Sequence, residues 1–96
     1  MKSFNKLSLA QVERLAILAE ECGETVQAAM KIIRRGYHRK HPHKPGPTNR
    51  AHLEDEIGNV LNAVEMLVEA GDVRSKKIKA SLESKRERVK KYLYHS

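Results

Sequence analysis

The fold of this chain is decided by one long stretch, residues 8–36, which reads SLAQVERLAILAEECGETVQAAMKIIRRG. Ser8 and Gln11 have the spacing of a capping box, in which each side chain accepts a hydrogen bond from the other residue's backbone N–H. Gly36 suits a C-cap, where a glycine commonly ends a helix. The stretch therefore predicts a helix over about residues 9–35.

Apolar residues recur along this stretch at steps of three and four, which keeps them on one side of a helix at about 100° per residue. They are Val12, Leu15, Ala19, Cys22, Val26, Met30 and Ile33. We interpret this stripe as the core face of the helix. Cys22 lies on it, which indicates a small core residue.

Three carboxylates, Glu20, Glu21 and Glu24, lie on roughly the opposite side of the same helix, within an arc of about 100°. The arc also holds Ile17 and Ala28. Two interpretations are open. The arc is either a solvated face with scattered apolar residues or a second, buried or half-buried surface.

Prolines and glycines rule out regular helix over residues 36–48 and predict a basic loop. Loops of this length in compact domains are often functional or mobile. A second helix is predicted over about residues 49–70, capped by Thr48 or Asn49 and stopped at Gly71. Its apolar face consists of Leu53, Ile57, Val60, Val64, Leu67 and Val68.

A third helix is predicted over about residues 73–93, with Asp72 as its cap. It is strongly basic, yet it carries an apolar stripe of Ile78, Leu82, Val89, Tyr92 and Leu93. We therefore expect this helix to pack on its neighbours, antiparallel to the second helix because the connection is short.

The 96 residues predict one all-α domain, residues 1–96, with a core so modest that a dimer or larger homo-oligomer is expected. No run is long and apolar enough to cross a membrane, and the N-terminus lacks the apolar core of a secretory signal. Cys22 is the only cysteine. We expect a cytoplasmic protein that does not contact membranes.

The formal net charge is +7, and the charge is segregated along the chain. Residues 31–50 hold seven Lys or Arg and no acid, residues 51–72 hold six acids and no Lys or Arg, and residues 73–96 hold nine bases against two acids. Two interpretations follow: nucleic-acid binding through phosphate neutralisation, or a compact site where acids hold metal and bases hold a phosphorylated small molecule.

The second helix carries a further group of oxygen ligands. Glu56 lies at the edge of its apolar face with Asn59 three residues on, so both side chains can reach a common point. Glu54, Glu65 and Glu69 lie opposite the apolar face and are expected to be solvated. Two groups of oxygen ligands facing each other across a helical hairpin indicate a magnesium site.

The basic candidates each have a structural alternative. Lys85 falls where the stripe of the third helix asks for an apolar residue, so its ammonium either reaches water beyond a packed stem or points at a phosphate. Arg88 flanks the same face. Lys31 and Arg34 either complement the dipole of the first helix or bind phosphate. The histidines raise a weak zinc alternative: His38, His41, His43 and His52.

Four segments, residues 18–31, 34–36, 49–50 and 53–59, together resemble the MazG-like all-α nucleoside triphosphate pyrophosphohydrolases, most closely their short phage and prophage members. The core motif is E-x-x-E followed after a spacer by E-x-x-D, and the similarity spans roughly residues 8–93. The resemblance implies helical hairpins that complete a four-helix bundle by oligomerisation, with active sites near subunit contacts. It also implies Mg²⁺-dependent hydrolysis of a (d)NTP to the monophosphate and pyrophosphate, with Mn²⁺ as a possible substitute.

The resemblance assigns roles by position. The metal ligands are Glu21, Glu24, Glu56 and Asn59. A carboxylate, Glu20 or Glu24, activates water as the catalytic group. The resemblance matches Lys85 and Arg88 to a basic motif on the last helix, and we expect these two residues, with Lys31 and Arg34, to neutralise substrate phosphates.

One residue departs from the family pattern. Asn59 stands where the family has aspartate, which keeps an oxygen ligand but removes a negative charge, so weaker metal affinity is expected. Compensation by Glu20 or Asp55, fewer bound ions, and a nucleotide-binding protein without catalysis all remain open. Two rival functions are a basic helical module that docks nucleic acid through residues 73–91 and a helical oligomerisation domain.

Overall fold

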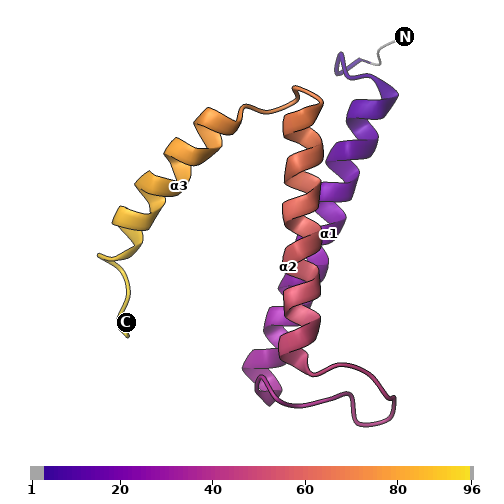
Figure 1. Cartoon of the computed structure of the whole chain (residues 1–96), viewed down its shortest axis with the longest axis vertical. Coiled ribbons are helices and arrows are strands. Elements are labelled where there is room, and N and C mark those ends of the chain that lie inside the picture. The colour runs from indigo at the N-terminus through magenta and orange to yellow at the C-terminus, as the bar shows by residue number, and fades with distance from the viewer. Residues whose placement is uncertain (1–3, 96) are drawn as a thin grey trace.

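The computed structural model describes residues 4–95 as three α-helices, α1 (Leu9–Arg35), α2 (Asn49–Glu69) and α3 (Ser75–Val89), shown in Figure 1. Within these residues the only β-type pairing is an isolated bridge between Lys40 and Thr48. The all-α prediction is confirmed. Residues 1–3 and 96 of the predicted domain lie outside the described residues.

The ends of α1 are as the sequence predicts. The Ser8 hydroxyl accepts from the Gln11 backbone N–H at 3.1 Å, and Gln11 Oε1 accepts from the Ser8 N–H at 2.7 Å, which completes the capping box. At the other end Gly36 adopts φ 88°, a conformation that favours glycine, and its N–H donates to the Ile32 carbonyl at 2.7 Å.

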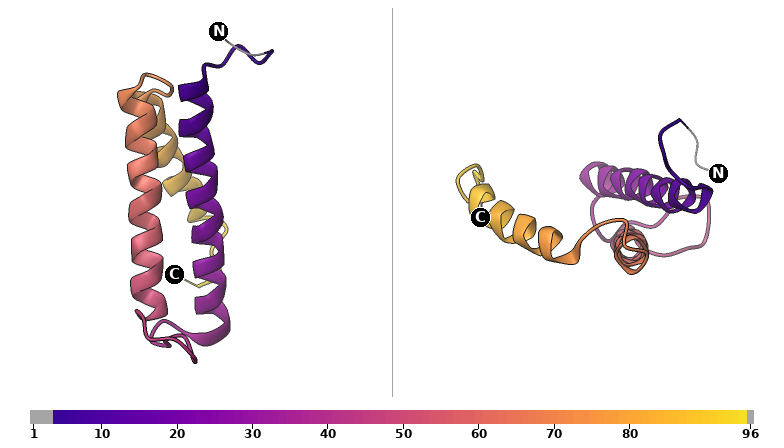
Figure 2. Two further views of the ribbon diagram at one scale, coloured as in Figure 1. Left: turned by 90° about the vertical axis from the view of Figure 1, so that its right-hand side faces the viewer. Right: turned by 90° about the horizontal axis from the view of Figure 1, so that it is seen from above.

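Helices α1 and α2 lie side by side and antiparallel as a hairpin, which Figures 1 and 2 show from different sides. Thr48 caps α2, its hydroxyl accepting from the Ala51 N–H at 3.1 Å, and Gly71 with φ 78° follows the last turn. Their packing gives a small core. Within residues 4–95 the buried apolar side chains are Ala28, Ala63 and Leu67.

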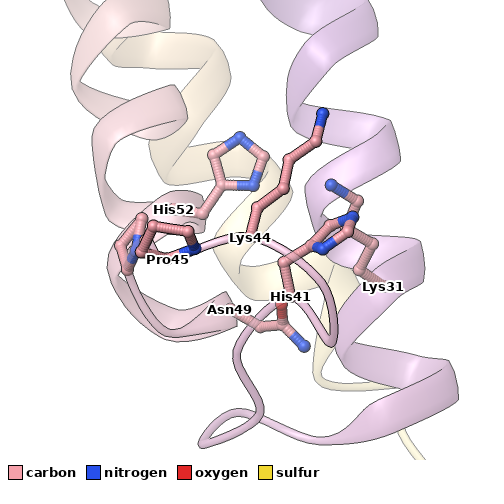
Figure 3. A pocket seen from close by; sticks show the side chains of 8 residues that line it. Lys31, His41, Lys44, Pro45, Asn49 and His52 are labelled. Atoms are coloured by element: carbon pink, nitrogen blue, oxygen red, sulfur yellow. The ribbon is translucent and has the colours of Figure 1, made fainter.

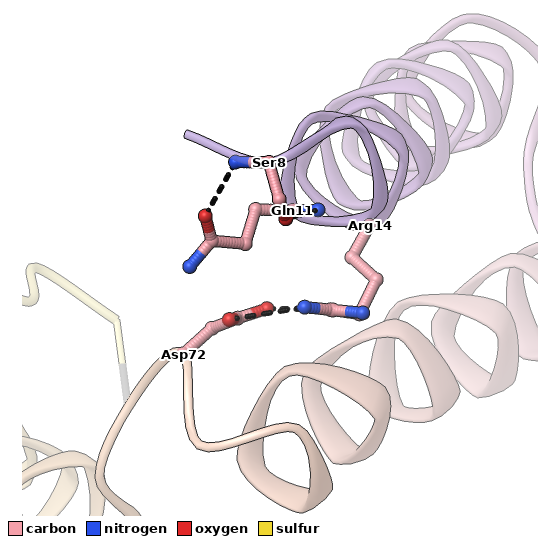
Figure 4. A network of polar contacts seen from close by, with 4 residues as sticks. All are labelled: Ser8, Gln11, Arg14 and Asp72. Atoms are coloured by element: carbon pink, nitrogen blue, oxygen red, sulfur yellow. Dashed lines mark hydrogen bonds and ion pairs between the residues drawn. The ribbon is translucent and has the colours of Figure 1, made fainter. Parts of the chain in front are cut away.

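The prediction that Asp72 caps the third helix is wrong. Helix α3 begins at Ser75 behind Arg74, whose side chain makes no capping hydrogen bond. The Asp72 carboxylate instead pairs with the Arg14 guanidinium, at 2.6 Å from Nε to Oδ2 and 3.2 Å from Nη2 to Oδ1 (Figure 4). This two-pronged pair joins the α2–α3 connection to α1, and because it stabilises the ionised form it lowers the pKa of Asp72.

The predicted core face of α1 is not the face that packs on α2. All seven residues of the apolar stripe are exposed, with Val26 62% and Ile33 74% accessible, and Cys22 is exposed with them rather than buried in a core. The side that faces α2 is instead the acidic arc with Ile17 and Ala28, both at least half-buried. The apolar stripe of α1 is therefore left uncovered in the single chain.

Most of the predicted apolar face of α2 does pack. Leu67 is 2% exposed, and four others are half-buried: Leu53, Val60, Val64 and Val68. Ile57 remains 43% exposed. The three acids predicted to be solvated are exposed: Glu54, Glu65 and Glu69.

The prediction that the third helix is packed is wrong for the single chain. Helix α3 has no buried residue and projects away from the hairpin (Figures 1 and 2), leaving Leu82 52% exposed. The radius of gyration is 17.0 Å, whereas a compact chain of this length has about 12–13 Å. None of the helices described here combines the length and apolarity needed to cross a membrane.

Candidate metal centre

Three of the predicted site residues come together where α1 and α2 face each other. Glu21 and Glu24 project from the inner side of α1 and Glu56 from α2, and one ligand oxygen from each lies within 4.8 Å of the others. Glu21 and Glu24 are half-buried and Glu56 is 9% exposed. Of the two interpretations of the acidic arc, the buried or half-buried surface is the one observed.

Two oxygens of this cluster lack a partner. Glu21 Oε2 and Glu56 Oε2 are both buried and make no hydrogen bond to any described residue. A buried ionised carboxylate is costly unless a cation, a proton or hydrogen bonds compensate it. The nearby Thr25 hydroxyl does not help, because it donates to the backbone carbonyls of Glu21 at 2.8 Å and Glu56 at 3.4 Å.

The electrostatics of the cluster follow from this crowding. A hydrogen bond shared with Glu56 raises the pKa of the Glu24 carboxyl, and the negative charge of Glu56 and burial raise it further, while His52 opposes the shift. His52 lies one turn before Glu56 on α2, with Nε2 3.3 Å from Glu56 Oε1. The site is therefore short of positive charge.

The donor set fits a hard divalent cation. Carboxylate oxygens are the ligands that Mg²⁺ and Mn²⁺ prefer, and a cation bound here would satisfy the two unpartnered oxygens and relieve the repulsion. Soft or borderline ions favour thiolate and imidazole. Among residues 4–95, this is the one group of three or more ionisable ligand residues close enough to hold an ion, and the loop histidines do not form another.

The other predicted site residues lie outside the cluster in the single chain. Asn59 is exposed one turn beyond Glu56, and Glu20 is exposed on the flank of α1. Lys31 is half-buried near the end of α1, and Arg34 is exposed. Lys85 and Arg88 are exposed on α3, which makes no extensive contact with the hairpin. Their predicted roles in binding metal or phosphate stay predictions.

Sequence reasoning missed one residue of the site. His52 had been considered only as a weak zinc ligand, whereas it contacts Glu56 and opposes the raised pKa of Glu24. Its spacing of four residues from Glu56 is the signal that identifies the contact, because residues i and i+4 are neighbours on a helix.

Comparison with known proteins identifies no relative. The chain matches no protein-family model, no curated protein and no solved structure.

Proposed function

We propose that this protein is a Mg²⁺-dependent nucleoside triphosphate pyrophosphohydrolase similar to the short phage members of the MazG-like family. We propose further that it acts in the cytoplasm. The observation that carries the proposal is the acidic cluster, in which three carboxylates from two helices place ligand oxygens within 4.8 Å and two buried oxygens lack partners. The order of Glu21, Glu24 and Glu56 along the chain adds support, since these three acids occupy three of the four positions of that family's motif.

The three carboxylates of the cluster have different proposed roles because their surroundings differ. Glu21 and Glu56 would hold the ion through their unpartnered oxygens. Magnesium, when bound, supplies positive charge that neutralises the triphosphate. Glu24, which lies within the same cluster, is the carboxylate placed to accept the proton of the attacking water. Glu20 lies on the exposed flank and is the less favoured base.

The reaction breaks one phosphoanhydride bond. The water oxygen forms a bond to the α-phosphorus, its proton passes to Glu24, and the bond from the α-phosphorus to the oxygen bridging to the β-phosphate breaks. The products are the nucleoside monophosphate and pyrophosphate. Lys31, half-buried on the same side of α1 as Glu24, is placed to neutralise phosphate charge as the bond breaks.

The proposal includes a homo-oligomer that completes a four-helix bundle. Its support is the exposed apolar stripe of α1, together with a radius of gyration well above that of a compact chain. In such an assembly α3 of one copy would bring Lys85 and Arg88 toward the acidic cluster of another. A dimer of hairpins contains the four helices that the bundle requires.

The test is a panel of nucleoside triphosphates incubated with magnesium, with release of pyrophosphate as the measurement. Wild type and Asn59→Asp are compared side by side. We expect cleavage by both, with Asn59→Asp reaching half-maximal rate at a lower magnesium concentration because it restores a negative charge one turn from Glu56. A panel in which no triphosphate is cleaved would reject the enzymatic function.

A second candidate function rests on α3. The helix has no buried residue, and residues 73–96 hold nine bases against two acids, which suits docking to nucleic-acid phosphates. Duplex binding that weakens steeply with salt, without any magnesium-dependent effect of nucleotides, would favour this candidate. A nucleotide that binds without being cleaved would indicate a non-catalytic binding module.

A further inference from the structure

A second polar feature lies in the same hairpin, toward its closed end. An open pocket of about 230 Å³ lies between the last turns of α1, the loop and the start of α2 (Figure 3). Five nitrogen-bearing side chains line it, together with two prolines and a glycine. The lining residues used below are Lys31, His41, Lys44, Pro45, Asn49 and His52.

The pocket is positively charged. Lys31 comes from α1 and Lys44 from the loop, no acidic residue lines the pocket, and neither lysine forms an ion pair with any residue of the described chain. His41 adds a donor. Its Nδ1 accepts from the His43 backbone N–H at 3.0 Å, so in the neutral ring Nε2 carries the hydrogen. An anion is the ligand that such a lining favours.

The walls of the pocket are held in place. The Asn49 backbone N–H donates to the Arg39 carbonyl at 2.8 Å, and its side-chain amide donates to the Gly36 carbonyl at 3.1 Å. The Arg50 N–H donates to the Tyr37 carbonyl at 2.9 Å, and the Arg50 guanidinium lies 5.0 Å from the Tyr37 ring centre. These contacts hold the two ends of the loop together, and Lys44 lies between those ends.

The pocket adjoins the acidic cluster. His52 lines the pocket and also contacts Glu56, with 3.3 Å between Nε2 and Oε1. On α1, Lys31 follows Glu24 by seven residues, about 10 Å along the helix axis. A ligand that bridges the two sites therefore places one end among carboxylates and the other among lysines.

The volume limits what the pocket can hold. Pockets that enclose drug-sized ligands measure about 300–1,000 Å³. At about 230 Å³ this pocket accommodates part of a nucleotide, and its lining includes no aromatic residue other than the histidines on which a base could stack. The charged end of a triphosphate fits the lining better than the nucleoside does.

We propose that the pocket lined by Lys31, His41 and Lys44 binds the β- and γ-phosphates of the substrate and retains them as pyrophosphate after cleavage. This rests on the proposed function, with the acidic cluster at the α-phosphate. The pocket then makes the enzyme select by phosphate-chain length, because a monophosphate cannot span both sites.

The experiment titrates inorganic pyrophosphate into the full chain without magnesium, by calorimetry and phosphorus NMR. The variants are Lys44→Ala and its matched control Lys40→Ala, an exposed lysine of the same loop that does not line the pocket. Circular dichroism checks folding. We expect pyrophosphate to bind wild type and Lys40→Ala alike and Lys44→Ala at least about tenfold more weakly, as for loss of a charged hydrogen bond.

Other outcomes separate this inference from the proposed function. Equal weakening by Lys44→Ala and Lys40→Ala, or no binding of pyrophosphate to wild type, overturns the pocket assignment even if nucleotides are cleaved. Pyrophosphate binding that depends on Lys44 in a protein that cleaves no triphosphate supports the anion site and rejects the enzyme. Glu56→Gln should lower cleavage about 100-fold or more and leave pyrophosphate binding intact.

Discussion

The two sides of α1 differ in composition and in burial. The inner side carries Glu21 and Glu24 among small and aliphatic residues and is covered by α2, while the outer side carries the more continuous apolar stripe and is exposed. Hydrophobicity alone would bury the outer side first. The single chain instead buries the side that holds the acids.

From this difference we infer that the inner side serves the proposed ion site and the outer side the proposed association between copies. Burying carboxylates costs stability unless a ligand compensates, which is the reason for proposing an ion site on the inner side. Val26 and Ile33 are exposed in the single chain, and burying them against another copy would favour association. The two sides can therefore be tested separately.

The largest expected effect is on the inner side, from Glu56→Gln. We expect magnesium-dependent pyrophosphate release to fall about 100-fold or more, since even the outer partners of metal ligands are worth about 10–100-fold. The metal-free protein should become more stable, because one buried negative charge is removed. Glu54→Gln, the same change at an exposed position of α2, is the control and should alter neither quantity.

Leu67→Ala tests the small core beneath the inner side. Leu67 is 2% exposed, and truncation of a buried leucine costs about 2–5 kcal/mol. Urea unfolding followed by circular dichroism measures the loss. Leu61→Ala, at a residue that is 59% exposed, should cost much less. Equal losses would mean that the hairpin does not pack as described.

Val26→Glu tests the outer side. A charge placed in the stripe should weaken self-association at least about tenfold, or roughly 1.4 kcal/mol, because it would be buried at the contact. Sedimentation over a range of protein concentrations measures the shift. Gln27→Glu introduces the same charge about 100° round the helix and should have a smaller effect. A wild-type protein that stays monomeric at all concentrations would contradict the assembly.

The smallest expected effect comes from the ion pair that joins α1 to the α2–α3 connection. Arg14 lowers the pKa of Asp72, so the pair contributes stability above the ordinary carboxyl pKa, near pH 4, and this is lost as pH falls through the lower folded value. Asp72→Asn should remove that part of the acid sensitivity. Thermal unfolding between pH 2 and 6 measures it, with Asp55→Asn, at an exposed position, as control.

Much of the fold follows from local chemistry. The capping box at Ser8, the glycine at position 36 and the prolines of the loop each act within a few residues, so the limits of α1 and α2 are predictable. Asp72 was misassigned because the competing partner, Arg14, lies far away in sequence. A helix cap and a tertiary ion pair draw on the same carboxylate, and only the fold decides between them.

Part of the site was also predictable from local spacing along the chain. Glu21, Glu24 and Glu56 are placed by helical spacing and by one hairpin. The side of α1 that packs on α2 was not predictable, because periodicity identifies an apolar stripe without identifying the surface that covers it. The pocket at the loop was also beyond prediction, since it forms where the loop, whose ends are joined by hydrogen bonds of Asn49, lies against the end of α1.

The separation of α3 from the hairpin has a consequence for the order of folding. Contacts between α1 and α2 span one loop and form early, whereas α3 has no buried side chain to hold it. In an isolated chain its amide hydrogens exchange with solvent through local opening far sooner than those around Leu67. We therefore expect the amides of α3 to be the last to become protected from exchange. Their protection then depends on the surface that α3 contacts after the hairpin has formed.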